Sequence, residues 1–310
     1  MQKIITKKGP TATRKSDLAV KVALYIKKTY NTEAEIISTD SRQLYKHLDI
    51  GTGKITKEEM HGVPHHMLDI VDPDNSSYSV FKFGQDAKKI IDDMHARAVV
   101  PILCGGTGFY IDAVVFGNIG ADTIPYVDEQ NELETLDIFE LQHIAKTLSD
   151  EKSIDISHVD TTNKRRLARA ITILRHDGVF AKPNTKPLYE TLYLGLDTST
   201  EKLRARIQKR IEARLQSGMI EESEKLLEQG NLTHTRMQKL GLEYKFISEY
   251  IQKKITLAEF TEKLFFAIWH YAKRQRVWFK KYLHTHWFDA DTTQKDATPV
   301  FEIVHLFLKK

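Results

Sequence analysis

The sequence predicts an α/β fold built on a parallel sheet, and three observations lead to this prediction. An apolar strand near the N-terminus is followed by a glycine-containing loop, a helix and a second apolar strand, which is how parallel α/β domains begin. The loop, residues 9–16, reads GPTATRKS and fits the phosphate-binding pattern G-x-x-x-x-G-K-[ST], except that Arg14 occupies the second glycine position. A further apolar strand ends at GGTG, residues 105–108, and ligands bind beyond strand ends in such sheets.

The first part of the chain supports this order element by element. Residues 3–6 are a short strand that runs into Lys7 and Lys8, although buried parallel strands usually stay apolar to their ends. The apolar positions of residues 16–30 fall on one side of a helix, and residues 35–38 are a buried strand. Beyond them the pattern predicts a strand at 67–71, a helix at 79–97 that Ser79 caps, and a strand at 98–104.

The pattern changes between residues 116 and 187. Acidic amphipathic stretches alternate with polar turns there, a basic helix is predicted at 163–175, and no strong strand is present. We therefore expect a mostly helical insertion at 116–187 in a P-loop NTPase-like core made of residues 1–115 and 188–310. The second part of that core is predicted to hold a strand at 192–196, helices at 199–217, 219–229 and 257–284, and an apolar tail at 300–308.

Composition narrows the classes of protein. The chain has 310 residues, a net charge of +4 and 41% hydrophobic residues, which suits a folded protein and permits a polyanionic partner without requiring one. Cys104 is the only cysteine, so no disulfide can form within the chain and a reducing cytoplasm fits. No apolar run approaches the roughly 18 residues that span a membrane. Nothing in the sequence indicates a protein partner, so we expect a cytoplasmic monomer.

The loop at 9–16 predicts that a phosphate or diphosphate is held near the N-terminus. In such loops backbone N–H groups surround the anion, the lysine reaches its oxygens, and the hydroxyl holds Mg²⁺, which assigns the last two roles to Lys15 and Ser16. Alone, the loop suggests ATP binding. Arg14 introduces a Cβ and a long side chain where a positive φ or a close phosphate approach would favour glycine.

Two further loops follow predicted strand ends. Asp40, in the sequence TDSRQ, is either an exposed turn carboxylate or a general base beside the phosphate site. The glycines around Thr107 either form only a tight turn or let the backbone approach a substrate with the threonine hydroxyl presented to it.

The remaining candidates are basic or imidazole side chains. Arg206 and Arg210 share one helix face with no Asp or Glu three or four residues away, so a diphosphate ligand explains them better than ion pairs along the helix. Basic residues at 164–169 and 273–281 are either solvated helix faces or contacts to a nucleic acid backbone. His65 and His66 are adjacent, which is poor spacing for zinc, and a structural role is favoured.

Together these segments resemble one family, the bacterial tRNA dimethylallyltransferases. The similar segments occur in the family's order over nearly the whole chain: GPTATRKS at 9–16, EIISTDSRQLYKHLDIGTGK at 35–54, GVPHHMLDIVDP at 62–73, YSVFKFGQDA at 78–87, PILCGGTGFYI at 101–111, RRLARAI at 165–171 and AKRQRVWF at 272–279.

The resemblance implies transfer of a dimethylallyl group from dimethylallyl diphosphate to N6 of adenosine 37, which adjoins the anticodon of tRNA on its 3′ side. It implies that Asp40 is the general base, that Thr107 contacts the tRNA near the reacting centre, and that Lys15 stabilises the departing diphosphate. The diphosphate-binding residues would be Gly9, Thr11, Ala12, Thr13, Arg14, Lys15, Ser16 and Arg206 or Arg210, with Mg²⁺ at Ser16. The tRNA anticodon arm would be bound by Asp40, Ser41, Arg42, Gln43, Thr107, Arg165, Arg166, Leu167, Ala168, Arg169, Lys273 and Arg274.

Two alternatives stay open at this point. Arg14 could have disabled the diphosphate loop, leaving a protein that binds tRNA without catalysis. The chain could instead be a kinase or a prenyltransferase acting on a free adenine nucleotide, although such a substrate needs neither the insertion nor the basic C-terminal helix.

Overall fold

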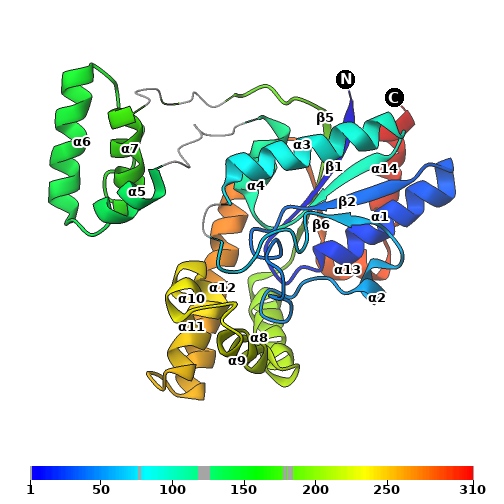
Figure 1. The fold of residues 1–310 in the computed structure, drawn as a ribbon. Coiled ribbons are helices and arrows are strands. Elements are labelled where there is room, and N and C mark those ends of the chain that lie inside the picture. Colours follow the sequence, from blue (N-terminus) through cyan, green and yellow to red (C-terminus); the bar gives the residue numbers. More distant parts are fainter. Residues whose placement is uncertain (1, 76–77, 118–125, 177–179, 181–183, 310) are drawn as a thin grey trace.

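The computed structural model describes residues 2–75, 78–117, 126–176, 180 and 184–309, and it contains a sheet of six strands with helices on both faces (Figure 1). The strands are β1 (Lys3–Lys8), β2 (Ala34–Ser38), β3 (His65–His66), β4 (Val100–Cys104), β5 (Glu190–Asp197) and β6 (Thr285–Asp289). Their order across the sheet is β3-β2-β4-β1-β5-β6, and all five strand pairs are parallel. The predicted α/β class is confirmed.

Helices make up most of the remaining described chain. The first group is α1 (Lys15–Tyr30), α2 (Lys57–Met60), α3 (Val80–Ala96) and α4 (Gly108–Val115). The middle group is α5 (Val127–Leu133), α6 (Ile138–Lys152) and α7 (Lys164–His176). The last group is α8 (Thr200–Gln216), α9 (Met219–Glu228), α10 (His234–Leu240), α11 (Leu242–Ile251), α12 (Leu257–Lys280), α13 (Ala290–Lys295) and α14 (Thr298–Lys309).

Alternation along β1 separates two hydrophobic cores. Ile4 faces a core formed with α3, α4 and α8–α12, and Ile5 faces a core formed with α1, α13 and α14. Successive side chains of a strand point to opposite faces, so one short strand contributes to both. The helices of both layers therefore fix the position of β1 and of the loop that follows it.

Lys7 and Lys8 lie inside the sheet, so the prediction that the strand ends at residue 6 was wrong. Lys7 pairs with Cys104 and Lys8 with Gly195, and both side chains are fully buried. Neither ammonium nitrogen has a hydrogen-bond partner among the described residues. Burial lowers the pKa of both lysines, that of Lys8 to about 6. The backbone pairing of a central strand has overridden the polarity of these two side chains.

Other predicted elements shifted. The strand expected at 67–71 is instead β3 at His65–His66, because Met67 and Asp69 have positive φ angles that no strand adopts. The helix expected at 257–284 ends at Lys280 and is followed by β6, which was not predicted. Helices α10 and α11 were not predicted either, and the apolar tail is helix α14.

Helices α5, α6 and α7 lie apart from the sheet in Figure 1 and share a small core of their own. Its buried members include Leu141 and Ala145 of α6 and Leu167 and Ile171 of α7. The predicted helical character of this part of the chain is confirmed for the described residues. Residues 118–125, 177–179 and 181–183 of the insertion predicted at 116–187 lie outside the described residues.

Candidate active site

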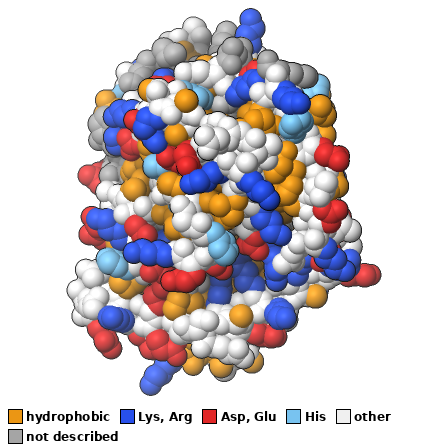
Figure 2. Space-filling view, turned by 90° about the vertical axis from the view of Figure 1, so that its right-hand side faces the viewer, with side chains coloured by type: hydrophobic (Ala, Val, Ile, Leu, Met, Phe, Trp, Pro, Cys, Tyr) orange, Lys and Arg blue, Asp and Glu red, His pale blue; other side chains and the backbone are white. Residues whose placement is uncertain are grey.

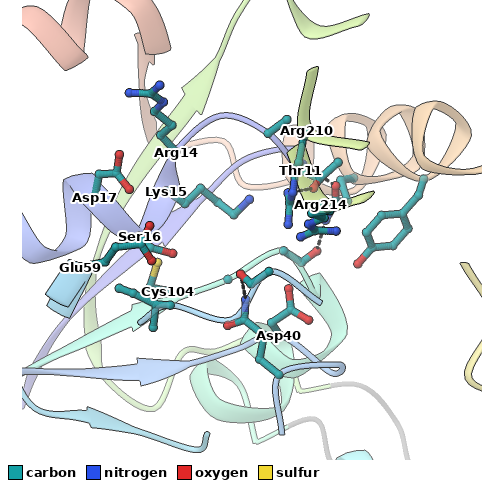
Figure 3. Close-up of a pocket in the computed structure, with 18 residues that line it drawn as sticks. Thr11, Arg14, Lys15, Ser16, Asp17, Asp40, Glu59, Cys104, Arg210 and Arg214 are labelled. Atoms are coloured by element: carbon teal, nitrogen blue, oxygen red, sulfur yellow. Dashed lines mark hydrogen bonds between the residues drawn. The ribbon is translucent and has the colours of Figure 1, made fainter. Parts of the chain in front are cut away.

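Three adjacent parallel strands end at the same edge of the sheet and bring three predicted residues together. Asp40 follows β2, Thr107 follows β4, and Lys15 follows the loop after β1. Asp40 and Lys15 line one pocket (Figure 3). Thr107 directly follows the lining residue Gly106, and its hydroxyl is hydrogen-bonded to Ser41. Carboxyl ends of parallel strands are where α/β proteins bind ligands, so this pocket is the candidate site.

Two side chains of the loop at 9–16 donate hydrogen bonds to the Pro10 carbonyl oxygen of the same loop. The Thr13 hydroxyl donates to the Pro10 oxygen at 2.8 Å, and Lys15 Nζ donates to the same oxygen at 2.9 Å. Burial lowers the pKa of Lys15, while interactions with Cys104 and with the Asp40 carboxylate raise it in part. An anion arriving in the pocket would favour the charged form of this lysine.

Arg14 adopts the backbone conformation that glycine would have. Its φ and ψ angles of 56° and 48° are left-handed, and it precedes α1 without a side-chain hydrogen bond to the helix. The side chain is exposed, and Figure 3 shows its guanidinium pointing away from Lys15. A left-handed residue with a Cβ costs about 1–2 kcal/mol. The loop therefore retains its shape at the expense of backbone strain.

Helix α8 supplies two of the arginines that line the pocket, Arg210 and Arg214, and Arg14 before α1 is the third. Arg210 Nη1 donates to the Thr11 hydroxyl at 2.8 Å, and Arg210 Nη2 donates to the Thr52 carbonyl at 3.3 Å. Arg206 donates to the Ala12 carbonyl at 3.3 Å and forms an ion pair with Asp291 of α13. This carboxylate comes from a different helix, so residue spacing along α8 does not reveal it. Of the two predicted arginines, only Arg210 lines the pocket.

Helix α12 contributes two pocket residues that were not predicted. Gln275, which is 5% exposed, accepts a hydrogen bond from the Thr11 N–H at 2.8 Å and donates one to the Gly106 carbonyl at 2.8 Å. A Cβ at Gly106 would lie 2.3 Å from the Gln275 amide, so this contact requires glycine. Tyr271 lies one turn earlier on the same face of α12. Gln275 was visible in the sequence only as part of the AKRQRVWF segment.

Hydrogen bonds hold the loop after β2 against the loop after β4. The Arg42 N–H donates to Asp40 Oδ1 at 2.9 Å, and the Ser41 N–H donates to the Thr107 hydroxyl oxygen at 3.1 Å. Burial raises the pKa of Tyr271 to about 12, so its hydroxyl stays protonated. Asp40 keeps its second carboxylate oxygen available to the pocket.

Gln43 completes this side of the site. Its Nε2 donates to the Gly53 carbonyl at 3.0 Å, and its Oε1 accepts from the Ser38 hydroxyl at 3.4 Å. It lines the pocket, as predicted for a residue near the substrate, whereas Arg42 does not.

The predicted basic contacts of the middle helices are spread over one face of α7. Arg165 and Arg166 are exposed and pair with Glu134 at 3.5 Å and Asp160 at 2.9 Å. Leu167 and Ala168 are fully buried in the small core, so their side chains face away from solvent.

Three further basic residues that were predicted to contact tRNA are exposed. Arg169 is exposed on α7, and Lys273 and Arg274 are exposed on α12. Figure 2 shows lysine and arginine side chains spread over that view of the molecule, some of them recessed in its lower half.

The two adjacent histidines have structural partners. His66 Nε2 is 2.8 Å from Glu35 Oε2, and His65 Nδ1 is 2.8 Å from the Val63 carbonyl oxygen. Within the described residues no three His, Cys, Asp or Glu side chains are grouped to hold a metal ion. The preference for a structural role over zinc agrees with this geometry.

The fold and the pocket define an α/β protein with a parallel sheet, in which a loop, a helix N-terminus and cationic side chains surround one site. The family model described as IPP transferase matches residues 43–282. The chain belongs to the IPP transferase family. Among the described residues, no helix has the length and apolar character needed to cross a membrane.

Relatives of similar length agree with this assignment. A tRNA dimethylallyltransferase from Caldanaerobacter subterraneus is 37% identical over 293 residues, covering 91% of this chain and 90% of the relative. One from Lacticaseibacillus paracasei is 35% identical and covers 100% and 98%.

Solved structures are also similar. The tRNA delta(2)-isopentenylpyrophosphate transferase from Staphylococcus epidermidis is 34% identical, with a TM-score of 0.71 and full coverage of both chains. A eukaryotic dimethylallyltransferase acting on tRNA is 26% identical, with a TM-score of 0.81 over 100% of this chain and 80% of that one.

Proposed function

We propose that this chain transfers a dimethylallyl group from dimethylallyl diphosphate to N6 of adenosine 37 in tRNA. The observation that carries the proposal is one pocket in which a carboxylate, Asp40, faces a half-buried lysine, Lys15, and an arginine, Arg210. A base on one side and cations on the other suit a reaction that removes a proton and releases a polyanion. The membership in the IPP transferase family and the names of its relatives support the same reaction.

The bond changes can be assigned to the two sides of the pocket. The adenine N6 forms a bond to C1 of the dimethylallyl group, and the C1–O bond to the diphosphate breaks with its electron pair going to oxygen. The N6 proton passes to Asp40, whose orientation is fixed by the Arg42 N–H. Thr107 would position the adenine, since its hydroxyl is held by Ser41 next to Asp40.

The departing diphosphate would be stabilised by the opposite side. Lys15 and Arg210 carry positive charge there, and backbone N–H groups at the start of α1 add a partial positive charge. Such groups act most strongly where negative charge develops in a site that excludes water. The Thr11 hydroxyl, which accepts from Arg210, joins the loop to this arginine.

The pocket fits Mg²⁺ bound together with the diphosphate. Ser16, Asp17 and Glu59 present oxygen atoms on the same side of the pocket, and Mg²⁺ prefers oxygen ligands and usually binds through one or two carboxylates with substrate phosphates and water. Ser16, which the loop pattern predicts as the Mg²⁺ ligand, would bind the ion. When bound, Mg²⁺ would supply charge neutralisation to the diphosphate.

The tRNA would be held by exposed basic side chains outside the pocket, namely Arg165, Arg166 and Arg169 on α7 and Lys273 and Arg274 on α12. Adenosine 37 is stacked in the anticodon loop, so it would have to be extruded to reach Asp40. Recognition by loop shape and splayed bases suits such a substrate. We propose that the chain acts as a monomer in the cytoplasm.

Mass analysis of tRNA nucleosides tests this proposal. Unmodified tRNA would be incubated with dimethylallyl diphosphate, Mg²⁺ and either the wild type, Asp40→Ala or the exposed control Asp74→Ala. The proposal expects N6-isopentenyladenosine from the wild type and the control, and a loss of at least a hundredfold for Asp40→Ala.

Two outcomes would support one of the two alternative functions instead. Preferred modification of AMP over tRNA in a competition assay would indicate a small-molecule prenyltransferase. Tight tRNA binding with no product at any Mg²⁺ or diphosphate concentration would indicate a binding protein.

A further inference from the structure

The pocket contains a second buried arginine whose donors are only partly used. Arg214 lies one turn beyond Arg210 on α8 and is 8% exposed. Its Nη1 donates to the Gly51 carbonyl at 2.8 Å and to Glu243 Oε1 at 3.0 Å. Its Nη2 is buried and has no hydrogen-bond partner among the described residues, although Arg214 lines the pocket. Buried donors left unpaired are rare, so this one calls for a ligand.

Gly53 shows how close the two arginines lie. A Cβ built on Gly53 would be 2.0 Å from Arg214 Nη2 and 2.7 Å from Arg210 Nη2. Both guanidinium groups therefore converge over one glycine, and any other residue there would displace them. Figure 3 shows the pair on the side of the pocket away from Ser16 and Glu59, with the Lys15 side chain extending toward them.

The charges at this side of the pocket are not balanced by the protein. Arg214 has one counter-ion, Glu243, whereas Lys15 and Arg210 form no ion pair within the described part of the chain. Three cations held close together by the fold are unfavourable until an anion with several oxygens joins them. A diphosphate has such oxygens, and the free Nη2 is a donor that none of the protein acceptors uses.

We infer that Arg214 is a direct ligand of the diphosphate and acts with Arg210 as a two-arginine clamp. This inference rests on the proposed function and adds to it a residue that sequence reasoning did not select. Glu243 on α11 accepts a hydrogen bond from Nη1, whereas Nη2 has no hydrogen-bond partner among the described residues. Two guanidinium groups one helical turn apart can donate to different oxygens of one diphosphate.

Calorimetric binding of inorganic pyrophosphate with Mg²⁺ tests the inference without requiring turnover. The proteins compared are the wild type, Arg214→Met, Arg214→Lys, Glu243→Gln and, as a matched control, Lys209→Met, an exposed cation on the same helix outside the pocket. We expect Arg214→Met to weaken binding about ten- to a hundredfold and Arg214→Lys to recover part of the loss. Glu243→Gln should bind within about threefold of the wild type, because the positive charge stays in place, and Lys209→Met should be unchanged.

Each other outcome has a definite meaning. Equal affinity of wild type and Arg214→Met would overturn the inference while leaving the diphosphate site intact. Equal losses for Arg214→Met and Glu243→Gln would also overturn it, because Arg214 would then serve only to tie Gly51 to α11. No pyrophosphate binding by the wild type would instead contradict the proposed function itself. If Arg214→Met does not fold, Arg214→Lys replaces it in the comparison. Weaker pyrophosphate binding by Arg214→Lys than by Glu243→Gln would then support the inference, and equal losses of affinity would overturn it.

Discussion

The backbone N–H of Thr11 donates to the side-chain oxygen of Gln275 at 2.8 Å, although 264 residues separate them. The amide nitrogen of Gln275 donates in turn to the Gly106 carbonyl at 2.8 Å. One buried side chain of α12 therefore ties the phosphate-binding loop to the loop that carries Thr107. The side of the pocket that holds Lys15 and the side that holds Asp40 depend on α12 for their relative position.

Replacing Gln275 by leucine should disturb both loops at once. The variant leaves a buried N–H and a buried carbonyl without partners, which costs about 1–3 kcal/mol each. We expect kcat/KM for dimethylallyl transfer to fall at least tenfold. The control is Gln208→Leu on α8, whose amide bonds only to Glu212 on the surface. A Gln275→Leu enzyme as active as this control would show that the two loops keep their positions without the amide.

Substituting Arg14 separates backbone strain from the guanidinium. Arg14→Gly should raise the free energy of unfolding by about 1 kcal/mol over Arg14→Ala, because alanine keeps the Cβ in the left-handed conformation and glycine does not. Urea unfolding of the two variants measures this difference. Equal stabilities would mean that the loop carries no strain at this residue.

Activity of the same two variants tests the idea that Arg14 has impaired the diphosphate loop. A large gain of activity in both variants would mean that the Arg14 guanidinium impairs the loop. A gain of activity in Arg14→Gly alone would mean that the Cβ impairs it.

Lys8 should make the free energy of unfolding increase as pH rises, the reverse of what a lysine with a raised pKa does. Burial lowers its pKa in the folded protein to about 6, with a partly opposing effect from Asp112, whereas the unfolded chain has the ordinary value near 10.5. Between these values the unfolded state binds more protons, so this lysine destabilises the fold at neutral pH and the penalty fades as pH rises. The rings of Tyr193 and Tyr282, whose centroids lie 4.2 and 3.4 Å from its Nζ, favour the charged form and so oppose the effect of burial on this pKa.

Lys8→Met is therefore expected to stabilise the protein by about 2–4 kcal/mol at pH 7. The gain should shrink toward pH 10 in urea unfolding series, and the exposed control Lys28→Met should show no such trend. A gain that does not change between pH 6 and 10 would mean that Lys8 is charged in the folded state.

Glu35 should also make stability rise with pH, but in the acid range and as a stabilising group. Hydrogen bonds from Arg97 at 2.8 and 3.1 Å and from His66 lower the pKa of this carboxyl group. A lowered folded-state pKa stabilises the protein above the ordinary value of 4.5, and the contribution is lost as pH falls through the folded-state pKa. Glu35→Gln should lower the melting temperature by about 5 °C at pH 7. The two melting curves should converge in acid; a constant difference down to pH 3 would argue against this assignment.

The sequence was informative wherever function depends on a strand end. Asp40, Thr107 and Lys15 could be selected because each follows a recognisable apolar strand, and parallel strands place their carboxyl ends together. Arg210 could be selected because its helix offered no local counter-ion. The α/β class and the helical character of α6 and α7 also followed from periodicity alone.

Other features depend on packing between distant segments, which periodicity does not report. Gln275 and Arg214 reach the pocket only because α12 and α8 pack against the sheet. Asp291 neutralises Arg206 from a helix 85 residues away. Lys7 and Lys8 were read as a strand end because their charge argues against burial, but backbone pairing with β4 and β5 extends the strand through both.

The central claim is that Asp40 takes the proton from N6 of adenosine 37 while the cationic side of the same pocket holds the diphosphate. Single-turnover transfer to tRNA, measured with saturating dimethylallyl diphosphate for the wild type and Asp40→Asn, tests it most directly. The account predicts one dimethylallyl group per tRNA at adenosine 37, none when guanosine occupies that position, and a rate for Asp40→Asn lower by about 10²–10⁴-fold with unchanged pyrophosphate affinity. Transfer by Asp40→Asn at the wild-type rate, or product on the guanosine-containing tRNA, would contradict it.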